Sequence, residues 1–165
     1  MKAQFQNGTM KTLWSPKSLK VIQKSKAEME AARAIRYGDA EALRANEHQI
    51  LYEVDLRSDD ASIEHEDYMT FWIASYRDHE AATEMFEVFM TTCSTAFDLD
   101  NYEQVMKLYA WPAMVGAISN QNIEILDYIK GYLDKKTIRE EMYEQHGEEE
   151  DWPPALFTWY DESFS

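Results

Sequence analysis

This sequence of 165 residues has few of the residues on which disulfides, metal sites and phosphate-binding loops depend. Its single cysteine, Cys93, has no partner for an intramolecular disulfide. The four histidines lie apart without Glu-x-x-His or His-x-x-x-His spacing, and the five glycines form no phosphate-binding loop. We therefore expect no metal and no cofactor, and we predict that the chain is not an enzyme. Catalysis would need a site assembled from residues distant in the sequence.

Long apolar runs are also absent. No stretch approaches the roughly 18 apolar residues of a membrane-spanning helix. Lys17, Lys20 and Lys24 interrupt the apolar run near the amino terminus, so it does not resemble a secretory leader. We expect a cytoplasmic protein without membrane contact, folded as one domain that needs no disulfide to bury its core.

Basic residues are scarce beyond residue 36, so the net charge of −15 is unevenly distributed. Residues 1–36 contain eight Lys or Arg and two acidic residues, whereas residues 37–165 contain eight Lys or Arg and 29 acidic residues. The acidic body repels nucleic-acid phosphates, so we expect it not to bind a nucleic acid directly. A basic protein surface would attract it. Acidity that serves only solubility is the alternative.

The apolar residues follow helical spacing, which predicts an all-α protein without a sizeable sheet. Gly38 ends a first helix over 27–37, and Asp39 caps a second that runs to about Tyr52. A polar connection is expected over 91–100. Pro112 should separate two helices, because the residue before a proline disfavours the α region. The other helices are expected over 68–75, 78–89, 102–109, 112–118, 123–133 and 137–146.

One pattern occurs three times, over 34–43, 73–82 and 117–126. Each copy has small or apolar residues at a helix end, a short polar turn, and a Glu that opens the next helix. A pattern that recurs at this scale is typical of stacked helical units, none of which can bury its apolar face alone. It favours a binding scaffold over an enzyme.

These copies resemble the ankyrin repeat over residues 29–133. Asn122-Ile123-Glu124-Ile125-Leu126 is similar to the turn and Glu-Ile-Val of that family, and the copy at 38–43 keeps the turn glycine. No copy has the family's Thr-Pro-Leu-His, and the opening glutamates Glu41, Glu80 and Glu124 are 39 and 44 residues apart instead of about 33. The resemblance implies stacked helix-turn-helix pairs with a concave recognition face. An irregular helical bundle is the alternative.

We predict three parts: a basic amino-terminal arm and helix over 1–28, a helical repeat domain over 29–147, and an acidic, aromatic tail over 148–165. The tail combines an acidic run with two prolines and five aromatic residues, and it has neither the pattern of an amphipathic helix nor that of a polar linker. Its aromatic residues either cap the apolar end of the last repeat or dock into a groove of a partner. We favour the cap.

The candidate partner-contacting residues are acidic or aromatic and form three groups along the chain. The acidic group lacks the glycine and alternating ligands of an EF-hand, and a solvated helix start is its structural alternative. Core packing is the alternative for the aromatic residues. The groups are Asp59, Asp60, Glu64, Glu66 and Asp67; Tyr109 and Trp111; and Trp152, Phe157 and Trp159.

Together these features predict a non-enzymatic protein-binding module that engages a basic face of a partner protein. Short acidic chains with degenerate repeats are typical of viral and phage accessory proteins, so an inhibitor of a host or defence factor is one expected role. The alternative is a nucleic-acid mimic that occupies a DNA- or RNA-binding cleft. Such a mimic needs carboxylates spaced like phosphates, at about one charge per 1.7 Å of duplex axis. The sequence leaves the partner's identity and the oligomeric state open.

Overall fold

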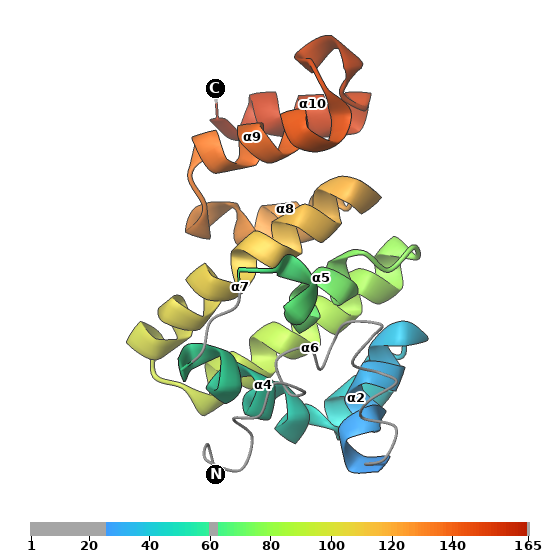
Figure 1. Cartoon of the computed structure of the whole chain (residues 1–165), viewed down its shortest axis with the longest axis vertical. Helices are drawn as coiled ribbons and strands as arrows, with labels where there is room; N and C mark the ends of the chain where they lie inside the picture. Colours follow the sequence, from blue (N-terminus) through green and yellow to red (C-terminus); the bar gives the residue numbers. More distant parts are fainter. Residues whose placement is uncertain (1–25, 60–62, 165) are drawn as a thin grey trace.

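The computed structural model describes residues 26–59 and 63–164, and these form α-helices joined by short 3-10 helices (Figure 1). No strand occurs within these residues, so the all-α prediction is confirmed. The same residues include no helix with the length and apolarity to cross a bilayer. Most of the predicted basic arm, together with Asp60, lies outside the described residues.

The helices follow one another with short connections. The α-helices are α2 (Lys26–Arg36), α3 (Ala40–Ala45), α4 (Glu47–Asp59), α5 (Met69–Ala74), α6 (His79–Ala96), α7 (Leu99–Asn120), α8 (Ile123–Ile129), α9 (Lys135–His146) and α10 (Pro154–Phe164). The 3-10 helices are η4 (His65–Asp67), η5 (Lys130–Tyr132) and η6 (Glu149–Asp151).

Polar side chains at the helix starts satisfy backbone N–H groups that have no partner inside the helix. In each of five cases the cap side chain accepts a hydrogen bond of 2.7–3.2 Å from the N–H three residues further on. The cap predicted at the start of α3 is among them, and the predicted last residue of the helix over 137–146 is also confirmed, since α9 ends at His146. The five caps are Asp39, Asp78, Asp98, Asn122 and Asp134.

The first and third copies of the repeated pattern share one turn geometry. Gly38 and Gln121 are both left-handed, with φ of 68° and 54°. In each turn the next residue donates its N–H to the carbonyl five residues back, at 2.8 Å from Asp39 and at 2.9 Å from Asn122. A side chain at Gly38 would also overlap the ring of Tyr76 in the second turn, so this position requires glycine for two reasons.

The helices on the two sides of these turns contact one another in succession. On one side α2 contacts α5, α5 contacts α7, and α7 contacts α9. On the other side α3 contacts α6, α6 contacts α8, and α8 contacts α10. Figure 1 shows the chain progressing from α2 near one end of the molecule to α9 and α10 at the other. Neighbouring turns are bonded too, since Asn120 donates to the carbonyl of Tyr76 and the ring of His79 lies 2.6 Å from the carbonyl of Asn120.

Helix α7 passes close to α5 and its carboxyl end at Gly116. A Cβ atom there would lie 2.6 Å from the carbonyl oxygen of Phe71 and 2.7 Å from Oγ of Ser75. We expect Gly116→Ala to lower the free energy of unfolding by about 1 to 2 kcal/mol, after the roughly 1 kcal/mol that alanine returns through helix propensity. Gly131→Ala is the matched control, because no atom lies within 4 Å of its added Cβ. Equal midpoints of urea denaturation for the two variants would contradict this packing.

Three predictions within the helical region are wrong. The helix expected from Asp39 to about Tyr52 is interrupted at Asn46, whose side-chain amide donates to the carbonyl of Ala42, and the chain resumes as α4 to Asp59. Helix α6 runs to Ala96 instead of giving way to a polar connection, because Thr92 and Cys93 continue its buried side. Pro112 lies inside a continuous α7. It is buried, as is the adjacent Ala113, so packing against neighbouring helices offsets the hydrogen bond that proline cannot donate.

The tail contains a helix, which its sequence pattern did not predict. Pro154 is the first residue of α10, where a missing N–H costs no helical hydrogen bond. Leu156, Trp159 and Tyr160 recur at helical spacing and are buried. Trp152 precedes the helix and packs edge-on against Tyr143 of α9, with ring centres 5.7 Å apart. The tail therefore folds back onto the helices before it.

Candidate protein-binding face

Three helices that contact one another in succession, α6, α8 and α10, contain acidic residues but no Lys or Arg. The three glutamates of α6 are spaced i, i+4 and i+7, which places them on one side of the helix. All seven carboxylates of these helices are exposed. We call this set the acidic face: Glu80, Glu84, Glu87, Glu124, Asp127, Asp161 and Glu162.

Hydrogen bonds join the acidic face across its helices. Tyr128 of α8 donates its hydroxyl to Oε2 of Glu87 on α6 at 2.8 Å. Trp159 of α10 donates its indole N–H to Oδ1 of Asp127 on α8, also at 2.8 Å. The hydrogen bond that Tyr128 donates to Glu87 raises the pKa of the Tyr128 phenol, because it stabilises the neutral, donating form. These two hydrogen bonds tie α6 and α10 to α8, through carboxylates of α6 and α8.

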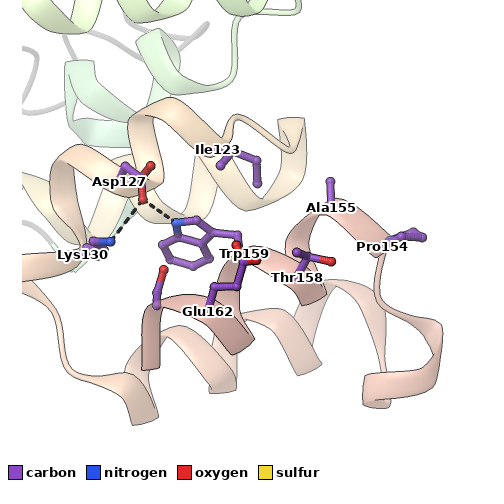
Figure 2. Close-up of a pocket in the computed structure, with 9 residues that line it drawn as sticks. Ile123, Asp127, Lys130, Pro154, Ala155, Thr158, Trp159 and Glu162 are labelled. Atoms are coloured by element: carbon purple, nitrogen blue, oxygen red, sulfur yellow. Dashed lines mark hydrogen bonds and ion pairs between the residues drawn. The ribbon is translucent and has the colours of Figure 1, made fainter. Parts of the chain in front are cut away.

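A groove of about 630 Å³ lies between α8 and α10 within this face (Figure 2). The indole ring of Trp159 lies between Asp127 on α8 and Glu162 on α10. Lys130 is beside it, with Nζ 3.4 Å from Oδ1 of Asp127. Ile123 and Ala155 line the groove away from Lys130, and they make that end apolar.

A second cluster of polar side chains is buried between α4 and α7. Glu53 and Arg57 have no exposed side-chain surface, and Nε of Arg57 lies 4.0 Å from Oε1 of Glu53. Tyr109 of α7 donates its hydroxyl to Oε2 of Glu53 at 2.5 Å. Burial raises the pKa of Glu53 to about 8, against the opposing effects of Arg57 and Tyr109. Burial and the nearby Glu53 also raise the pKa of Tyr109 well above its ordinary value.

Residues 30–161 match the family of unknown function DUF5903. The chain belongs to this family. The matched segment runs from α2 into α10, so it includes the buried cluster and most residues of the acidic face and of the groove. A comparison with curated proteins found no match, and a comparison with solved structures found none either.

In this member of DUF5903, the predicted site residues from the middle of the sequence lie around η4. Glu64 is exposed, Glu66 is half-buried, and the carbonyl of Glu66 accepts the indole N–H of Trp72 at 2.9 Å. Trp111 is half-buried, with its ring centre 5.9 Å from that of His65. The structure thus brings Glu64, Glu66 and Trp111 into one neighbourhood.

The remaining predicted residues are more scattered. Asp59 is exposed at the end of α4, whereas Asp67 and Tyr109 are buried. In the tail, Trp152 is buried and Phe157 is 40% exposed. Trp159, the third predicted site residue in the tail, is 6% exposed and lines the groove. It is the predicted residue that contacts the acidic face directly, through Asp127.

Neither the acidic face nor the buried cluster was predicted from the sequence. A signal for the face was present, because residues 78–106 and 140–165 contain no Lys or Arg. The buried cluster has no comparable signal, since glutamate and arginine in a helix ordinarily face solvent. Cys93 lies near this cluster, where burial raises its pKa to about 12 and keeps it a thiol. Within residues 26–59 and 63–164, no three His, Cys, Asp or Glu side chains are grouped to hold a metal ion.

Proposed function

We propose that this chain is a non-enzymatic protein-binding module that engages a basic face of a partner protein through its acidic face. The observation that carries the proposal is that three helices in successive contact have seven exposed carboxylates and no Lys or Arg. Such a surface attracts a basic partner over the screening length, about 8 Å at physiological salt, and disfavours acidic ones.

We further propose that the scaffold is an ankyrin-like stack in which α2/α3, α5/α6, α7/α8 and α9/α10 are the helical pairs. The successive contacts on both sides of the turns support this arrangement, as does the turn geometry that the first and third copies share. In a stack, equivalent helices of neighbouring units lie side by side and together form an extended binding surface. The seven residues of the acidic face lie on three such equivalent helices.

A module of this kind acts by occupying the basic surface of its partner. We therefore infer the role of an inhibitor, as in accessory proteins that viruses and phages direct against host factors. Where the partner uses that surface to bind DNA or RNA, the module acts as a nucleic-acid mimic. Competition with duplex DNA for the captured partner would distinguish this case from binding at another basic surface.

Charge neutralisation on the acidic face tests the proposal. The immobilised chain should retain basic proteins from a cell lysate at low salt and release them as salt rises, because screening weakens the attraction. The variant E84Q/E124Q/D161N changes one exposed residue on each of α6, α8 and α10 and should lose most of this capture. Quantitative mass spectrometry of the retained proteins measures the loss.

The matched control changes the same number of exposed acidic residues elsewhere. D100N/E103Q/E144Q alters α7 and α9, on the other side of the turns, and should keep the captured proteins. Equal losses from both triple variants would show that net charge, and not the acidic face, governs capture. If the amount of retained protein does not change with salt, the acidic residues serve solubility and not binding.

A further inference from the structure

The groove between α8 and α10 already holds a cation that belongs to the chain itself. Nζ of Lys130 lies 3.4 Å from Oδ1 of Asp127, and both side chains remain partly exposed, at 42% and 54%. The indole N–H of Trp159 bonds to the same carboxylate oxygen, Oδ1. An exposed ion pair between lysine and aspartate is weak, because such pairs contribute about 0 to 1 kcal/mol. A cation that binds Asp127 more tightly can therefore displace Lys130.

The rest of the groove suits a long side chain with a charged end. Glu162 provides a second carboxylate on the α10 side of the Trp159 ring, and it has no ion-pair partner among residues 26–59 and 63–164 (Figure 2). Ile123 and Ala155 offer apolar surface for a methylene stem. A planar guanidinium can hydrogen-bond to two carboxylates and stack on an aromatic ring, whereas an ammonium is a compact point charge.

We propose that this groove receives an arginine side chain from a basic segment of the partner protein. Its guanidinium contacts Asp127 and Glu162 beside the Trp159 ring, its stem packs along Ile123 and Ala155, and Lys130 is displaced from Asp127. The inference rests on the proposed function and names the residue type that the acidic face recognises. Charge complementarity decides the occupant, because the groove has carboxylates at one end and apolar side chains at the other.

The test uses a short peptide with a central arginine between two leucines, acetylated and amidated at its ends. A peptide with citrulline in place of arginine has nearly the same shape without the charge. The indole N–H signal of Trp159, assigned with Trp159→Phe, should shift on titration with the arginine peptide and much less with the citrulline peptide. Lys130→Met should tighten binding about two- to fivefold by removing the competing cation, and Glu162→Gln should weaken it by a similar factor.

Two control variants separate the groove from general electrostatics. Lys136→Met removes the same charge from a side chain on α9 that is 85% exposed, and Glu144→Gln is the corresponding change to an acid on α9. Both should leave the peptide affinity nearly unchanged. Equal affinity changes at Lys130 and Lys136, or equal shifts with the two peptides, would overturn the inference. A Trp159 signal that shifts with protein concentration alone would assign the groove to a second copy of the chain and would also overturn it.

The inference and the proposed function can fail separately. If E84Q/E124Q/D161N loses the captured proteins while Glu162→Gln keeps both these and the peptide, the acidic face remains the binding surface and the arginine groove is refuted. If the arginine peptide binds as expected but no basic protein is captured in a salt-sensitive way, the groove stands and the proposed function falls.

Discussion

Deletion of residues 148–165 should remove most of the free energy of unfolding. The deleted segment buries Trp152, Leu156, Trp159 and Tyr160 against the preceding helices. Each such side chain contributes about 1.5 to 3 kcal/mol, so the four contribute on the order of 6 to 12 kcal/mol, against roughly 5 to 15 kcal/mol for a whole domain. The truncated chain should melt far below the full chain or aggregate, as measured by circular dichroism during heating.

Two single substitutions in α10 provide the control. Leu156→Ala removes a fully buried side chain and should cost about 2 to 5 kcal/mol. The adjacent Phe157 is 40% exposed, so Phe157→Ala should cost distinctly less. A truncated chain that melts like the full chain would contradict a capping role, and loss of partner capture in that chain would identify the tail as a docking segment.

The variant Glu53→Gln should gain stability over the natural chain as pH rises. The carboxyl of Glu53 has a pKa of about 8 when folded, against 4.5 in its ordinary state. Below pH 4.5 the Glu53 carboxyl is protonated in both the folded and the unfolded chain, so its titration does not change the free energy of unfolding. Between the two values the unfolded chain releases a proton that the folded chain keeps, so the free energy of unfolding falls by about 1.4 kcal/mol per pH unit. Glutamine does not titrate, and it still accepts the hydrogen bond from Tyr109.

Urea denaturation at several pH values between about 5 and 8 measures this difference, which should reach several kcal/mol. Glu84→Gln removes the same charge from an exposed position and should show no comparable divergence from the natural chain. The charged groups that act on Glu53 are Arg57, which favours its ionised form, and Asp67, which disfavours it. Parallel curves for Glu53→Gln and the natural chain would mean that Arg57 keeps Glu53 ionised in the fold.

The local signals in the sequence predicted much of the helical arrangement. Gly38 and Asp39 mark a helix end and a helix start because their effects depend on the nearest turn of backbone alone. Pro112 misled the prediction, since its cost is local but the packing that offsets it comes from other helices. The helix in the tail was missed although its proline is favourable for a helix. Its proline occupies the one helical position where proline is favourable, at Pro154.

The candidate site was less predictable than the fold. The lack of basic residues on α6, α8 and α10 can be counted in the sequence, but their adjacency cannot. Glu87 and Tyr128 are 41 residues apart, and Asp127 and Trp159 are 32 apart, yet each pair is joined by a hydrogen bond. The burial of Glu53 likewise depends on α7, because Tyr109 is 56 residues away.

The composition of the acidic face also determines which chemical reagents can label it. Because α6, α8 and α10 contain no lysine, amine-directed reagents cannot modify a side chain of these three helices. Among the described residues, Lys130 lines the groove and Lys135 hydrogen-bonds to the carbonyl of Phe164, so both offer amines at the edge of this surface. Attaching the protein to a support through lysines elsewhere in the chain leaves the carboxylates of the acidic face accessible. A carbodiimide, by contrast, activates those carboxylates. A carbodiimide can join them directly to lysines of a bound protein without a spacer. Carboxylate-to-lysine coupling should therefore detect a protein bound at the acidic face. Lysine-to-lysine cross-linkers should miss most of the same contact.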